Sequence, residues 1–79
     1  MTHVRVKLTF PENLIKQPII GRLAREFDVL PNIRRANVEE SVGWMVCELG
    51  GEEDAVARAI SWLEELGVQV DRLGDVVES

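Results

Sequence analysis

The chain has 79 residues, of which 46% are hydrophobic and 29% are charged, and its formal net charge is −5. This composition is typical of one small folded domain and excludes a largely disordered segment. No apolar run approaches the ~18–20 residues that a membrane-spanning helix needs, and the N-terminus does not resemble a signal peptide. We therefore expect a single domain over residues 1–79 that lies in the cytoplasm without inserting into a membrane.

The charge is unevenly distributed along the chain. Residues 1–35 carry a net charge of +4, whereas residues 36–79 carry −9. A nucleic-acid-binding domain usually presents an unopposed basic face. The acidic half weakens binding to a polyanion, so we expect no nucleic-acid partner.

The first third of the sequence predicts a strand followed by a helix. Residues 3–10 alternate apolar and polar side chains, which is typical of a strand with one buried face. Pro11 ends this strand because proline has no backbone N–H to donate. An apolar stripe then predicts a helix over 17–28, with 12–16 as a looser lead-in.

The next segment, residues 29–40, predicts an irregular strand at the edge of a sheet. Ile33 lies in the opposite phase to Ala36 and Val38. Either a bulge switches the face, or an arginine lies near the core edge with its head in water. Residues 39–43 then predict a hairpin turn closed by glycine.

The remaining sequence predicts a strand, a helix and a last strand. Residues 44–49 are apolar on both faces and end at two glycines. Residues 52–66 repeat apolar side chains at helical spacing, and Gly67 suits a left-handed C-terminal cap. Residues 68–73 form a short last strand with a polar tail after it.

The order strand, helix, strand, strand, helix, strand predicts an α+β fold. Each strand–helix–strand unit has a right-handed crossover, and the hairpin joins strands two and three. The simplest arrangement is a ferredoxin-like βαββαβ sandwich. Its four-stranded antiparallel sheet has the order 4-1-3-2, with both helices on one face.

This arrangement leaves the other sheet face bare. The residues expected on it are Arg5, Lys7, Thr9, Trp44, Val46, Glu48, Gln69 and Asp71. An exposed tryptophan beside a valine is typical of a contact surface, so we expect Trp44 and Val46 to lie at an interface with a second copy or a partner. Alternatively, the stems of Arg5 and Lys7 cover Trp44 on an ordinary surface.

Residues that support catalysis are scarce. His3 is the single histidine and lies at the terminus, and Cys47 is the single cysteine and falls on the buried phase of a strand. A lone cysteine excludes a cysteine-clustered metal site within the chain, and Gly50-Gly51 lacks the rest of a phosphate-binding loop. We expect no enzyme activity, no catalytic residue, no bound metal and no cofactor.

Several short motifs together resemble one known family. The run Asn32-Ile33-Arg34-Arg35-Ala36-Asn37-Val38 resembles the signature of the NIL domain, which is named for an Asn-Ile-Leu sequence. Matching segments continue from about residue 4 to 76. They are Phe10-Pro11-Glu12, Gln17-Pro18-Ile19-Ile20, Gly43-Trp44-Met45-Val46, Ala59-Ile60-Ser61-Trp62-Leu63 and Leu73-Gly74.

The resemblance implies a regulatory role. NIL domains are ferredoxin-like modules of methionine-import ABC transporter ATPases, where they pair, bind methionine near the dimer interface and inhibit uptake. The resemblance implies that Asn32, with its neighbour Ile33, lies at the ligand site. From the residues alone, Asn32 is interpreted instead as a turn or edge residue that bonds its own backbone after Pro31. Arg34 replaces the leucine of the signature.

Two hypotheses for function follow. The first is a homodimeric module that senses methionine or a related sulfur amino acid at its interface, and signals to a transporter ATPase or a sulfur-metabolism enzyme. The second is a protein–protein adaptor for a ferredoxin-type or sulfur-transfer enzyme, without a ligand of its own.

Overall fold

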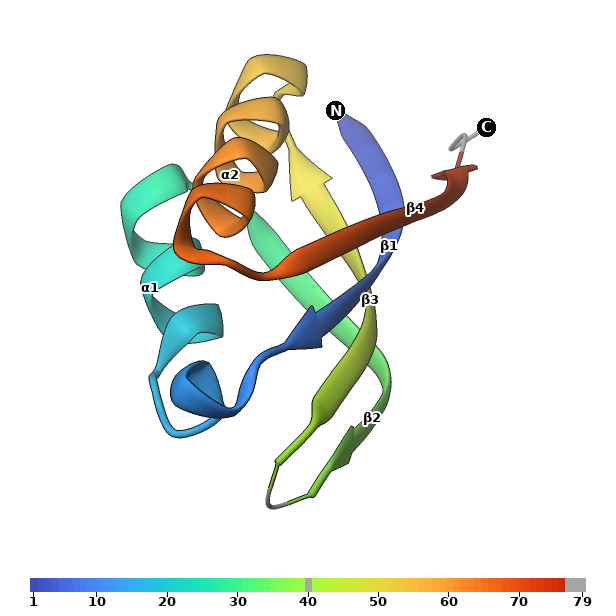
Figure 1. The fold of residues 1–79 in the computed structure, drawn as a ribbon. Coiled ribbons are helices and arrows are strands. Elements are labelled where there is room, and N and C mark those ends of the chain that lie inside the picture. Colours follow the sequence, from blue (N-terminus) through green and yellow to red (C-terminus); the bar gives the residue numbers. More distant parts are fainter. Residues whose placement is uncertain (40, 77–79) are drawn as a thin grey trace.

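The structure confirms the predicted α+β sandwich. A computed structural model describes residues 1–39 and 41–76 of the chain. The described elements are β1 (Thr2–Phe10), a short 3-10 helix η1 (Glu12–Leu14), α1 (Ile19–Phe27), β2 (Leu30–Val38), β3 (Gly43–Gly51), α2 (Glu53–Leu66) and β4 (Gln69–Val76). The sheet has the order β2-β3-β1-β4, and each neighbouring pair is antiparallel. Both helices cover the same face of this sheet (Figure 1).

The core lies between that face and the two helices. β1 occupies the centre, and its alternating Val4, Val6 and Leu8 are buried beneath the helices. Cys47 and Leu49 of β3 lie on the same face and are fully buried. Because side chains alternate along a strand, the residues between these positions face the uncovered side of the sheet. We call this uncovered side the open face.

Local residue chemistry explains where the helices begin and end. α2 carries Glu53 and Asp54 in its first turn, which suits the helix dipole, and Gly67 caps its end at φ 105°. α1 begins after Pro18, slightly later than predicted, because proline is accepted before the first turn but not inside the helix. The expected lead-in contains η1.

The irregular edge strand is explained by a bulge. The pairing of β2 with β3 shifts between Ile33 and Arg35, so Arg34 is an extra residue without a partner. This extra residue brings Ile33 onto the same face as Ala36 and Val38. Of the two alternatives in the sequence, the bulge is therefore the correct one.

β3 is longer than the sequence predicts. The glycines Gly50 and Gly51 were expected to end the strand, but both continue it. A Cβ on Gly50 would lie 3.1 Å from the His3 ring, and one on Gly51 would lie 3.3 Å from the Asp28 carbonyl oxygen. Both glycines therefore permit a close approach of neighbouring chain, which is a recognised use of glycine within strands.

The connections around β3 and β4 agree with the prediction in outline. The Glu39 N–H donates to the Val42 carbonyl at 2.8 Å, which closes the predicted hairpin. Glu40, within that predicted turn, lies outside the described residues. β4 extends to Val76, beyond the predicted end at 73, since a second register shift lets the pairing with β1 resume after an irregularity.

Burial makes the Cys47 thiol unreactive. Its side chain is fully buried, and desolvation raises the pKa from 9.0 to about 11. The thiolate is the nucleophile, so a pKa two units higher lowers the reactive fraction at neutral pH about a hundredfold. We expect a disulfide reagent to label the native protein at least that much more slowly than the urea-unfolded chain. Equal rates in the two states would contradict the burial.

Candidate ligand site

An apolar pocket opens where the start of the first helical segment faces the β2–β3 hairpin. Its volume is about 100 Å³. The residues that line it are Phe10, Leu14, Ile15, Gln17, Ile19, Ile20, Val38, Gly43 and Met45. An apolar hollow of this order accommodates a guest of a few heavy atoms.

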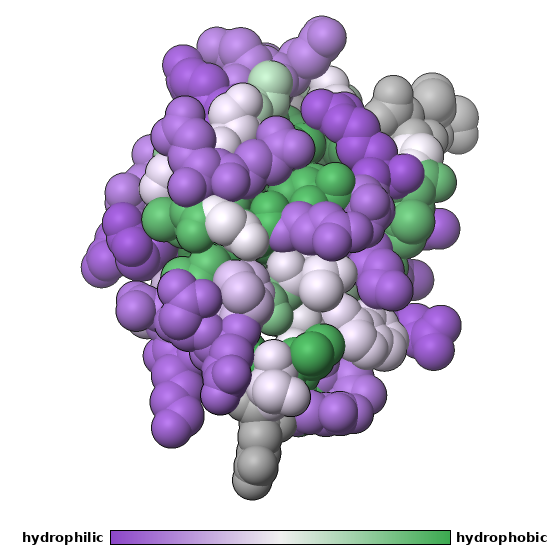
Figure 2. Space-filling view, in the orientation of Figure 1, coloured by the Kyte–Doolittle hydropathy of each residue, from purple (hydrophilic) through white to green (hydrophobic). Residues whose placement is uncertain are grey.

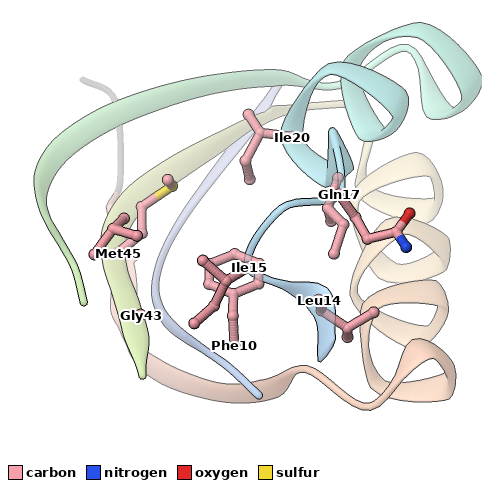
Figure 3. A pocket seen from close by; sticks show the side chains of 9 residues that line it. Phe10, Leu14, Ile15, Gln17, Ile20, Gly43 and Met45 are labelled. Carbon is pink, nitrogen blue, oxygen red and sulfur yellow. The ribbon is translucent and has the colours of Figure 1, made fainter. Parts of the chain in front are cut away.

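Figure 3 shows how these side chains are arranged. Phe10 and Ile15 lie in the middle of the view, with Met45 projecting from β3 on one side and Ile20 from α1 above. The amide of Gln17 points away from Met45, so the interior is lined by hydrocarbon and one thioether sulfur. Such a lining favours an apolar, polarisable group over a charged one.

Gly43 keeps the pocket open at the hairpin end. A Cβ placed on Gly43 would lie 3.6 Å from the Ile15 side chain, which is an ordinary contact distance. A larger side chain at this position would extend into the hollow. Gly43 is cross-strand from Val38, which is 65% exposed at the edge of the sheet. The pocket therefore lies next to an uncovered edge strand.

The predicted ligand residues Asn32 and Ile33 lie at the other end of β2. Asn32 is cross-strand from Glu48 and belongs to the open face, whereas Ile33 is cross-strand from Cys47 and belongs to the helix-covered face. Both side chains are exposed. Arg34 is extra, so Asn32 and Val38 are five pairing positions apart, about 17 Å along the strand, and their side chains lie on opposite faces of the sheet.

The predicted interface residues Trp44 and Val46 both lie on the open face. Trp44 is cross-strand from Thr9, and Val46 is cross-strand from Lys7. The Trp44 ring lies between two cations, with the Lys7 Nζ 5.4 Å and the Arg35 guanidinium 5.8 Å from its centroid. Both apolar side chains are half-buried.

Glu48 forms an ion pair on the open face. The Arg5 Nη2 donates to the Glu48 Oε2 at 2.9 Å, and the Glu48 side chain is only 16% exposed. This hydrogen bond lowers the pKa of Glu48 below its ordinary value, against a smaller opposing effect of burial, and Arg34 lowers it further. Glu48 therefore remains charged and is neutralised by its neighbours.

In the part of the chain that the structure describes, no group of three or more His, Cys, Asp or Glu side chains could hold a metal ion. Over the same residues, neither helix combines the length and the apolar character of a membrane span. Figure 2 shows hydrophilic residues over most of the visible surface, with hydrophobic residues in a band across its middle.

The sequence analysis did not predict the pocket, although it identified the segments that form it. Three of the short motifs that the resemblance matched supply residues of the pocket. They contribute Phe10, then Gln17, Ile19 and Ile20, and then Gly43 and Met45. These motifs are distant in sequence and converge only after folding. The convergence of separated motifs is the signal that indicates a shared site.

Comparison with known proteins places these motifs in one family. A family model described as "NIL domain" matches residues 4–72. The methionine import ATP-binding protein MetN of Chromohalobacter salexigens is 38% identical over 79 residues, which cover 95% of this chain and 23% of that protein. The protein of the same name from Coxiella burnetii is 35% identical over 75 residues, covering 90% of this chain and 21% of that protein. The chain thus spans about a fifth of the length of these relatives.

Solved structures share the fold. The C-terminal domain of an ABC transporter ATP-binding protein from Enterococcus faecalis has a TM-score of 0.78 and 29% identity, covering 90% of this chain and 83% of that chain. The de novo designed protein Foldit4 has a TM-score of 0.61 at 10% identity, covering 99% and 98% of the two chains, and this likeness concerns the fold alone.

Proposed function

The chain belongs to the NIL domain family, and on that basis we propose that it is a regulatory domain that binds methionine, or a related sulfur amino acid, where two copies meet. Its relatives are methionine import ATP-binding proteins. The ligand acts by favouring one arrangement of the two copies, with no chemical step and no enzyme activity. The partner that reads this arrangement is a transporter ATPase in the cytoplasm.

The apolar pocket beside the exposed edge strand is the observation that carries this proposal. Methionine has an unbranched side chain ending in a polarisable thioether, which adapts to irregular apolar hollows. The pocket offers Met45, Phe10 and Ile15 as apolar neighbours and a volume of about 100 Å³. The polar end of the amino acid then lies at the mouth, near Val38.

The polar end needs donors and acceptors, and a second copy supplies them. An asparagine amide donates to a carboxylate and accepts from an ammonium group. Arg34 is an extra residue, so two β2 strands that pair antiparallel about a two-fold axis near Arg35 place Asn32 of one copy opposite Asn37 of the other, one position from Val38 and on the open side of the shared sheet. This pairing brings Asn32 of the second copy to the edge beside the pocket mouth, which Asn32 of the same chain does not reach.

The test is thermal unfolding in the presence of L-methionine. Ligand at a hundred times its dissociation constant stabilises the folded state by ~2.7 kcal/mol, which corresponds to a rise in Tm of roughly 10–20 °C for a domain of this size. We expect Asn32→Ala and Gly43→Val to abolish the rise while both variants still fold. Gln69→Ala, which removes an exposed amide on β4 at the opposite edge of the sheet, is the matched control and should keep the rise.

Three results would contradict the proposal. The first is a Tm that does not change with millimolar methionine. The second is an equal loss of the rise in Asn32→Ala and Gln69→Ala, which would show that Asn32 has no particular role. The third is an equal rise with lysine or glutamate, which would show that the apolar pocket does not select the ligand.

A further inference from the structure

The open face of the sheet carries more cations than the carboxylates of the described residues pair with. Four cations belong to it or adjoin it: Arg5, Lys7, Arg34 and Arg35. Arg5 is paired with Glu48 at 2.9 Å. Among the described residues, no carboxylate lies within ion-pair distance of the other three. This local excess of positive charge occurs in a chain whose net charge is −5.

The cations are held in place by the sheet. The Trp44 ring lies between Lys7 of β1 and Arg35 of β2, at 5.4 and 5.8 Å from the two charged groups. The bulge places Arg34 beside Arg35, and Arg34 is close enough to Glu48 to lower the pKa of that carboxyl group. These contacts already restrict the conformations of the long side chains. Binding a partner therefore costs less conformational entropy.

The helices do not cover this face, as Figure 1 shows. At its centre, Trp44 and Val46 present half-buried apolar surface. Around them lie neutral polar side chains, among them Asn32 and Asn37 on β2. An apolar centre with an aromatic residue, a polar rim and arginines is the composition of a protein–protein interface.

We propose that the open face docks an acidic polypeptide surface, with carboxylates of the partner paired to Lys7, Arg34 and Arg35. Charge complementarity identifies this occupant. A nucleic acid fits less well, because its bases would have to stack on the Trp44 ring, which Lys7 and Arg35 of the chain itself already contact. The carboxylates of Glu48 and Asp71 also flank the basic patch. The inference does not depend on methionine binding.

The two tryptophans allow a direct test in the intact chain. Trp62 lies in the helical layer, 5.3 Å from the Phe27 ring, so Trp62→Phe leaves Trp44 as the sole fluorescent reporter of the open face. A short glutamate homopeptide is the probe. We expect a saturable change in Trp44 emission that weakens steeply as salt is added.

Two matched charge variants, both made in the Trp62→Phe chain, assign the surface. Lys7→Gln with Arg35→Gln removes two open-face cations and should weaken peptide binding about tenfold. Arg25→Gln with Arg58→Gln removes two exposed cations of the helices, changes the net charge equally, and should leave binding within about twofold.

Three outcomes would overturn the proposal. One is unchanged Trp44 emission over the whole peptide titration. Another is an equal loss of affinity in the two charge variants, since net charge alone would then explain binding. The last is tighter binding of a single-stranded oligodeoxythymidine of matched charge, which would assign the face to nucleic acid. None of these readouts involves methionine, so the proposed amino-acid site is tested separately, by thermal unfolding.

Discussion

Replacing Leu63 with alanine is expected to remove a large part of the stability of the domain. Leu63 lies in α2 with its side chain fully buried against the sheet. A buried Leu→Ala change costs about 2–5 kcal/mol, from lost burial and from the cavity that remains. A chain of this length has a free energy of unfolding of roughly 4–12 kcal/mol. We expect the Tm to fall by about 10–30 °C, measured by circular dichroism with a urea titration at 25 °C.

Leu73→Ala provides the comparison. Leu73 is 51% exposed on β4, so its truncation should change the free energy of unfolding by no more than about 0.5 kcal/mol. If the two substitutions lowered the free energy of unfolding equally, burial would not explain the contribution of Leu63 to stability. An unchanged unfolding midpoint for Leu63→Ala would place the core elsewhere.

Replacing Ile33 and Val38 together with lysine is expected to separate the proposed dimer. These side chains are 50% and 65% exposed in one chain, on the same face of the edge strand β2. An edge strand with exposed apolar groups favours pairing with another strand, and lysine is the residue that most often prevents it. Losing two apolar contacts from each copy should raise the dissociation constant more than about a hundredfold. Sedimentation velocity at micromolar concentration measures the change.

The opposite edge of the sheet supplies the control for this experiment. Leu73→Lys places one lysine on β4 in the same kind of exposed apolar position and should leave self-association intact. Added salt gives a second check, because the proposed pairing brings Arg35 side chains of two copies together, and screening of this repulsion should strengthen the dimer. A wild-type chain that sediments as a monomer, or a Leu73→Lys variant that dissociates equally, would contradict pairing through β2.

The fold was predictable because its main elements have clear periodicities. Leu8 and its neighbours alternate along β1, and Leu63 belongs to an apolar stripe with helical spacing, so both the element type and the buried face follow from the sequence. Gly67 was predicted to end α2, and its φ of 105° confirms this. The family resemblance and the strand order are likewise confirmed.

The remaining features depend on contacts between distant segments. The extension of β3 through Gly50 rests on the approach of His3, forty-seven positions earlier in the chain, and local glycine preference predicts the opposite. The pocket needs Phe10, Ile20 and Met45 from three separate segments. Asn32 stays a predicted ligand residue on the exposed edge, because a site completed by a second copy has no signature within one chain.

The bulge at Arg34 also gives β2 a position at which the length of the strand can change by one residue. Every neighbour of Arg34 on β2 has its own cross-strand partner on β3, and Arg34 has none. Deleting it would join Ile33 directly to Arg35 and keep each side chain on its present face. If Ile33 or Arg35 were deleted instead, Arg34 would take the vacant place, whereas a deletion farther along β2 would move the residues between it and the bulge to the opposite face. The edge strand thus tolerates loss of a residue at the bulge, and homologous chains that differ by one residue in this strand should align with their gap there.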